Sequence, residues 1–96
     1  MVEISFDPLK NARNIELRGL TFERAGAFEF ATAWIIVDDR KDYGEIRYRA
    51  IGFLEERLHA LVFTETQGGI RVISFRKANQ REERLYEHAN TKPGTD

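Results

Sequence analysis

The stretch between residues 34 and 76 constrains the fold of this 96-residue chain more than any other feature. Its segments are continuously apolar or alternate between apolar and polar side chains, which is the pattern of β-strands. Gln67-Gly68-Gly69 separates the last two segments and is typical of a hairpin turn. Because the links are short, consecutive strands are expected to run antiparallel. The pattern predicts a sheet meander of about four strands at residues 34–37, 45–54, 58–66 and 70–76.

The residues before the meander predict a short strand followed by a helix. Residues 2–6 alternate as a strand does. Asp7 can cap a helix that has Pro8 at its first position and that Gly19 ends, so a helix is expected over residues 8–17. The residues expected to face inward are Leu9, Ala12 and Ile15.

Two further helices are expected on either side of the meander. Thr21 can cap the first, over residues 22–31, whose probable buried stripe recurs at helical spacing and consists of Phe22, Ala25 and Phe28. Asn79 and Glu82 form a variant of the capping box, which predicts a last helix that ends near Ala89.

The order of elements predicts an α+β fold made of an N-terminal strand, two helices, an antiparallel meander and a C-terminal helix. We expect the helices to lie on one side of one sheet. Residues 1–90 form a single domain, because a chain of this length builds one core. Residues 91–96, which contain Pro93 and Gly94, are expected to be a flexible tail.

Composition excludes several classes of protein. No apolar run approaches the roughly 20 residues that span a bilayer, so we expect no membrane association. The chain has no cysteine, which fits a reducing compartment, and a cytoplasmic location is expected. His59 and His88 lie far apart and no cluster has metal-ligand spacing, so we expect no metal and no cofactor.

Positive charge gathers where the last strand passes into the last helix. The chain as a whole has a net charge of −1, which argues against a protein that coats nucleic acid indiscriminately. Between residues 71 and 84, however, five basic residues outnumber two acidic ones. Such a local excess is the electrostatic footprint of a polyanion site. The basic residues are Arg71, Arg76, Lys77, Arg81 and Arg84, and the acidic ones are Glu82 and Glu83.

An ordered set of short motifs between about residues 6 and 86 resembles one family. The set is quite specific, although each fragment alone is weak. The motifs are Phe6-Asp7-Pro8-Leu9-Lys10-Asn11 with Asn14 and Gly19, Phe22-Glu23-Arg24-Ala25, Asp42-Tyr43-Gly44-Glu45-Ile46-Arg47, Gly52, Val62-Phe63-Thr64, and Arg71-Val72-Ile73-Ser74-Phe75-Arg76-Lys77-Ala78-Asn79 with Glu82 and Tyr86. They resemble BrnT, the toxin of a type II toxin–antitoxin pair.

The resemblance implies a RelE-like fold and a metal-independent endoribonuclease that inhibits translation. It also implies neutralisation by a cognate BrnA-like antitoxin of the ribbon-helix-helix type, with operator DNA bound only through that antitoxin. One position departs from the family, whose first loop usually reads Asn-x-x-Lys-His-Gly, because here Arg18 precedes Gly19. A guanidinium stays protonated at pH 7 and cannot replace a histidine in proton transfer. The departure favours an alternative hypothesis, an inactive homologue that acts as an antitoxin-binding co-repressor module. A third hypothesis is a plain protein-interaction domain.

Cleavage of RNA without a metal requires proton transfer and stabilisation of the phosphorane's negative charge. Arginine grips two phosphate oxygens at once, so arginines are the expected RNA-binding groups. We expect several of them to converge on the scissile phosphate. The predicted RNA-binding residues are Arg18, Arg47, Arg49, Arg71 and Arg81, and the predicted catalytic residues are Arg76, Lys77, Glu82 and Tyr86, with His59 as a further acid–base candidate.

Each of these residues also has a purely structural interpretation. Arg47 and Arg49 beside Glu45 fit a salt-bridged, solvated sheet face. Arg18 favours the dipole at a helix C-terminus. Among the remaining residues, Glu82 can close the cap, Tyr86 can cover the edge of the core, His59 can be a packed histidine, and Arg76, Lys77 and Arg81 can be solvated surface residues.

Overall fold

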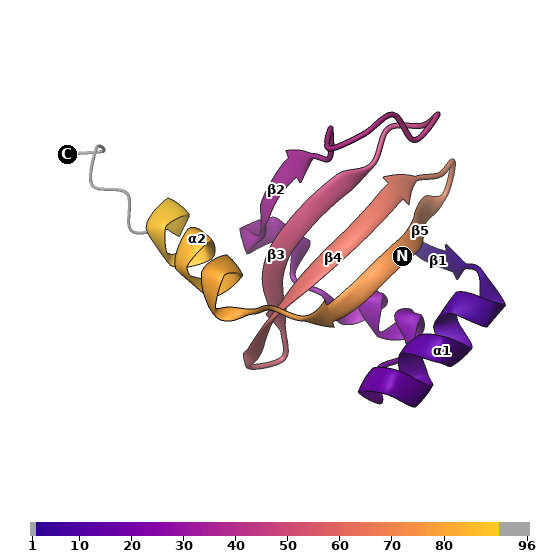
Figure 1. Cartoon of the computed structure of the whole chain (residues 1–96), viewed down its shortest axis with the longest axis horizontal. Helices are drawn as coiled ribbons and strands as arrows, with labels where there is room; N and C mark the ends of the chain where they lie inside the picture. Colours follow the sequence, from indigo (N-terminus) through magenta and orange to yellow (C-terminus); the bar gives the residue numbers. More distant parts are fainter. Residues whose placement is uncertain (1, 91–96) are drawn as a thin grey trace.

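A computed structural model describes residues 2–90 of the chain (Figure 1). The predicted flexible tail, residues 91–96, lies outside the described residues. The elements in chain order are β1 (Glu3–Phe6), α1 (Pro8–Arg18), the 3-10 segments η1 (Phe22–Ala27) and η2 (Phe30–Thr32), β2 (Trp34–Val37), β3 (Tyr48–Leu54), β4 (Arg57–Glu65), β5 (Gly69–Lys77) and α2 (Gln80–Asn90).

One sheet of five strands in the order β1-β5-β4-β3-β2 organises the molecule. Strands β2 to β5 form the predicted antiparallel meander, and the α+β fold is confirmed. Strand β1 adds in parallel to the edge of β5, where Glu3 pairs with Gly69 and Phe6 with Val72. The strand expected over residues 45–54 is shorter than predicted. Strand β3 begins at Tyr48, so residues 45–47 belong to the preceding loop.

Helix α1 has the predicted boundaries but not the predicted inward face. Asp7 caps it and Gly19 ends it in the left-handed conformation, with φ of 67°. Leu9 is 80% exposed, and Ala12 and Ile15 are also exposed, so the expectation of an apolar inward side was wrong. The buried residue is Asn14, which is only 6% exposed.

Asn14 is buried because α1 lies against a strand edge. Strand β1 pairs with β5 only as far as Val72, which leaves the later carbonyls of β5 without a strand partner on that side. The Asn14 amide donates to the carbonyls of Phe75 and Leu20, both at 2.9 Å. A buried carbonyl requires a donor, and this side chain supplies one where a strand would otherwise be needed.

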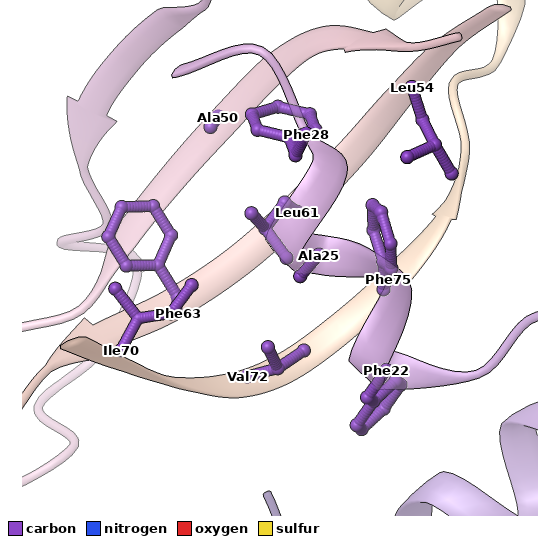
Figure 2. Packing of buried hydrophobic residues seen from close by; sticks show 10 residues of the cluster. All are labelled: Phe22, Ala25, Phe28, Ala50, Leu54, Leu61, Phe63, Ile70, Val72 and Phe75. Atoms are coloured by element: carbon purple, nitrogen blue, oxygen red, sulfur yellow. The ribbon is translucent and has the colours of Figure 1, made fainter. Parts of the chain in front are cut away.

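The predicted second helix is instead a pair of 3-10 segments. Thr21 accepts a hydrogen bond from the Glu23 amide, as expected of a cap. Phe22, Ala25 and Phe28 are buried as predicted, with exposures of 2%, 0% and 4%. A spacing of three residues places side chains directly above one another in a 3-10 helix, so this geometry also presents the three to the sheet. Figure 2 shows them over the core side chains of β3, β4 and β5.

The expectation that the helices cover one side of the sheet was wrong. The segment η1 packs on the face that carries Ala50 and Leu54. Tyr86 of α2 packs instead with Ile51, and Phe53 packs against the same cluster. Because successive residues of a strand point to opposite faces, α2 lies on the face opposite η1. It contacts one end of that face, and we call the remainder the open face.

Candidate functional site

The junction of β5 and α2 holds Arg76 in a fixed position on the open face. Its Nη1 and Nη2 donate to Glu82 Oε1 and Oε2, each at 2.8 Å. Glu82 Oε1 also accepts from the Asn79 amide, while the Asn79 side chain accepts from the Glu82 amide, so the predicted capping box is confirmed. The bond to Arg76 is the main cause that lowers the pKa of Glu82, and it correspondingly raises the pKa of Arg76. Glu82 therefore positions a guanidinium at the start of α2.

A second fixed guanidinium comes from the loop after β2. Asp38 is buried and accepts from Arg40 Nε at 2.7 Å and Nη2 at 2.8 Å, and the Tyr43 hydroxyl donates to the same carboxylate at 3.2 Å. The bond from Arg40 lowers the pKa of Asp38 to about 2. Sequence reasoning missed this pair, because it treated residues 38–44 as an ordinary polar loop. The signal for it was an acid and an arginine two residues apart, directly after an apolar strand.

Glu45 links two of the predicted RNA-binding arginines. Its carboxylate accepts from Arg47 Nε at 2.9 Å and from Arg71 Nη2 at 2.9 Å to each oxygen. The Arg47 guanidinium also lies over the Tyr43 ring, 4.2 Å from its centre. These contacts confirm the expected salt bridge of Arg47 with Glu45, but not one of Arg49, and they keep Arg47 and Arg71 in place. They leave open whether these two arginines bind RNA.

Arg49 differs from these arginines because its charge is not bound by a carboxylate. It projects from β3 on the same face as Arg47, as expected, and it is half-buried. Within residues 2–90 its side chain makes no hydrogen bond or ion pair, although it is near enough to lower the pKa of Glu82 further. Its guanidinium donors are available to a ligand.

These groups line one cavity of about 200 Å³, which we call the open-face hollow. Its charged lining is four arginines and two carboxylates, which gives a net charge of +2. Arg71 is not among the lining residues and joins the group only through Glu45. The charged residues of the lining are Arg40, Arg47, Arg49, Arg76, Asp38 and Glu82.

The predicted site residues do not all meet in this hollow. Arg18 and Lys77 line a second cavity of about 670 Å³ beside the turn between β3 and β4, which we call the hairpin hollow. Lys77 follows Arg76 on a strand, so its side chain points to the other face. Arg76 is the residue that the linings of the two cavities share. Arg81 is exposed on α2 and lines neither of them.

Tyr86 and His59 are packed residues. The Tyr86 hydroxyl donates to the Thr32 carbonyl at 3.2 Å, and its ring meets Phe53 edge-on at 5.6 Å. His59 is 5% exposed, and its Nδ1–H donates to the Arg57 carbonyl at 2.9 Å. Burial lowers the pKa of His59, so its ring is neutral at pH 7. Tyr86 would have to leave its place in the core to take part in proton transfer.

Within residues 2–90 no three His, Asp or Glu side chains are grouped so that they could hold a metal ion. In the same part of the chain, no helix has the length and apolar character needed to cross a membrane. The charged lining of the open-face hollow supplies guanidinium groups, which bind phosphate and stabilise negative charge that develops on it.

Comparisons with known proteins agree on one family. The family model of BrnT, a ribonuclease toxin of type II toxin–antitoxin systems, matches residues 6–82. The chain is also similar to the crystal structure of the Brucella abortus ribonuclease toxin BrnT, with a TM-score of 0.64 and 26% identity, over 83% of this chain and 100% of that one. No curated protein matches the chain. The matched residues include every arginine that lines either hollow.

Proposed function

Because the chain belongs to the BrnT family of ribonuclease toxins of type II toxin–antitoxin systems, we propose that it is a metal-independent endoribonuclease and that the scissile phosphate binds in the open-face hollow. The observation that carries this proposal is the pairing of a free arginine with a fixed one. Arg49 makes no ion pair within residues 2–90, whereas two bonds of 2.8 Å hold Arg76 on Glu82.

The two arginines have complementary parts in the proposed reaction. Attack of the RNA 2′-hydroxyl on the adjacent phosphate, with loss of the hydroxyl proton to water, builds a phosphorane with increased negative charge on its oxygens. The bond from phosphorus to the 5′-oxygen then breaks, this oxygen takes a proton from water, and a 2′,3′-cyclic phosphate remains. Arg49 binds the phosphate with all its donors, and Arg76 contributes a positive charge that needs no reorganisation during the reaction. Glu82 is a positioning residue, since its carboxylate orients Arg76. Lys77 lines the other hollow, so its proton-transfer role stays a prediction, as do the roles of Arg71, Arg81 and Tyr86.

The biological part of the proposal follows from the family. Cleavage of cellular RNA in the cytoplasm would inhibit translation, and a cognate BrnA-like antitoxin of the ribbon-helix-helix type would neutralise the toxin. Operator DNA would be bound through that antitoxin. A net charge of −1 on the whole chain supports DNA binding by the antitoxin and not by the toxin, because the chain itself is not suited to bind duplex DNA without a basic partner.

One observation favours a second function, that of an inactive homologue retained as an antitoxin-binding co-repressor module. Arg18 stands where the family's first loop usually has histidine, and its Nη1 donates to Asn14 Oδ1 at 3.0 Å. It is thus held in the structure of α1 and supplies no titratable group at neutral pH.

Growth of cells that express the chain alone separates the two functions. The first function predicts growth arrest, relieved by Arg49→Ala and by coexpression of the antitoxin. Arg84→Ala is the matched control, because it removes an equal charge from an exposed residue that lines neither hollow. Normal growth at a high level of folded wild-type protein would contradict the first function and support the second.

A further inference from the structure

The hairpin hollow is a second basic cavity, and the proposed cleavage step does not use it. Its volume of about 670 Å³ lies in the range of cavities that hold small organic ligands. Five basic and two acidic side chains line it, which gives a net charge of +3. The size and the sign of the cavity both fit an anion as large as a nucleotide.

Two of the cations in this hollow have no carboxylate partner. Arg24 is paired with Glu55 at 2.6 Å. Arg18, in contrast, donates to the neutral Asn14 amide oxygen, and Lys77 makes no ion pair within residues 2–90. Like charges held in one hollow repel each other, so a bound anion would relieve this repulsion. Arg18 comes from the end of α1 and Lys77 from the end of β5, so the fold itself brings them together.

Part of the lining of the hairpin hollow is uncharged, and some of it is apolar. Burial lowers the pKa of His59, and the nearby charges of Arg57 and Lys77 lower it further, which keeps the ring neutral. Leu20 and Leu54 complete this part of the lining. A lining that combines cations with uncharged groups suits a ligand that joins a phosphate to a less polar group, as a nucleotide does.

We propose that the hairpin hollow is a second phosphate-binding subsite, which takes another nucleotide of the RNA strand that is cleaved in the open-face hollow. Arg18 and Lys77 bind the phosphate, and Arg76 contributes to the lining of both hollows. This inference rests on the proposed ribonuclease function, because it places the RNA strand in the open-face hollow first. The presence of Arg76 in both linings and the uncharged part of this lining favour RNA here over an acidic segment of a protein partner.

Binding of a single-stranded deoxyoligonucleotide of about six nucleotides tests the subsite without cleavage, because the strand lacks the 2′-hydroxyl that attacks. Arg18→Ala and Lys77→Ala should each weaken binding about fivefold and the double variant about twentyfold, as expected for partly exposed ion pairs. The dependence of log K on log salt should become shallower by about 0.7 for each cation removed. Arg84→Ala, the matched control, should bind within about twofold of the wild type, and circular dichroism should confirm that all variants are folded.

The two histidines provide a direct probe of where the strand lies. In nuclear magnetic resonance titrations, saturation with the oligonucleotide should raise the pKa of His59, because a phosphate offsets the cations that lower it. The ring resonances of His88, which is exposed on α2 and lines neither hollow, should not move when the oligonucleotide is added.

The inference is overturned if the double variant binds as tightly as the Arg84→Ala control while the pKa of His59 stays constant. It is also overturned if the wild type does not bind the oligonucleotide but binds an oligoglutamate peptide in this hollow. That result would assign the surface to an acidic protein partner. Oligonucleotide binding as expected, together with no cleavage of the matching RNA, would refute the ribonuclease proposal alone.

Discussion

Removal of the Glu82 carboxylate tests whether the start of α2 holds Arg76 in position. The Glu82 side chain is 11% exposed, and it accepts two bonds from Arg76 and one from the Asn79 amide. Glu82→Gln keeps an oxygen that can accept the hydrogen bond from the Asn79 backbone amide, but it removes the negative charge. Glu82→Ala removes all three hydrogen bonds and leaves Arg76 without its carboxylate partner.

The expected losses of unfolding free energy follow from these contacts. Loss of the capping bond costs about 1 kcal/mol. Loss of a partner from a fully buried ion pair costs about 3–5 kcal/mol, but Arg76 is 34% exposed and can turn toward water, so about 1–2 kcal/mol is expected here. We therefore expect about 1 kcal/mol for Glu82→Gln and about 2–3 kcal/mol for Glu82→Ala.

Urea denaturation at pH 7, followed by circular dichroism, measures both values. Glu83→Ala is the matched control, because Glu83 is the next residue of the helix and its contact with Arg57 is a loose one at 4.0 Å between exposed groups. That control should cost less than about 0.5 kcal/mol. If Glu82→Ala were no more destabilising than Glu83→Ala, Glu82 would not be the residue that anchors Arg76.

Other positions give independent tests. Asp38→Asn should lower the free energy of unfolding at pH 7. Because the pKa of Asp38 is lowered to about 2, the difference in this free energy between the wild type and the variant should shrink below about pH 4 and vanish near pH 2. Denaturation curves measured across this pH range check the prediction. Asn14→Ala removes the donor of the Phe75 carbonyl and should cost about 1–3 kcal/mol in urea denaturation, whereas an unchanged midpoint would contradict the role assigned to the amide. Gly52→Ala should cost about 1–3 kcal/mol in thermal denaturation, because the new methyl group would lie 2.8 Å from a Phe28 ring carbon; an equally stable variant would contradict this packing.

Local patterns in the sequence predicted the parts of the fold that depend on near neighbours. The strand segments of the meander, the caps at Asp7 and Asn79 and the buried trio led by Phe22 all follow from spacing along the chain. Spacing alone did not distinguish an α-helix from 3-10 segments over residues 22–32, because apolar residues three apart satisfy both.

The errors concern contacts between distant residues. Burial of Asn14 depends on the free edge of β5, 61 residues away in sequence, which no local pattern reveals. The side of the sheet that α2 covers depends likewise on the exit direction of β5. The separation of Arg76 from Lys77 was, in contrast, predictable, since adjacent strand residues point to opposite faces.

The central proposal is that the open-face hollow cleaves RNA through Arg49 and Arg76 without a metal ion. Incubation of the purified chain with a single-stranded RNA in the presence of a chelator tests this directly. We expect cleavage by the wild type and full activity in Arg84→Ala. In Arg49→Ala the rate of cleavage should fall by about 100-fold or more, while the free energy of unfolding stays within about 0.5 kcal/mol of the wild type. Intact RNA after incubation with folded wild-type protein, or an Arg49→Ala variant as active as the wild type, would contradict it.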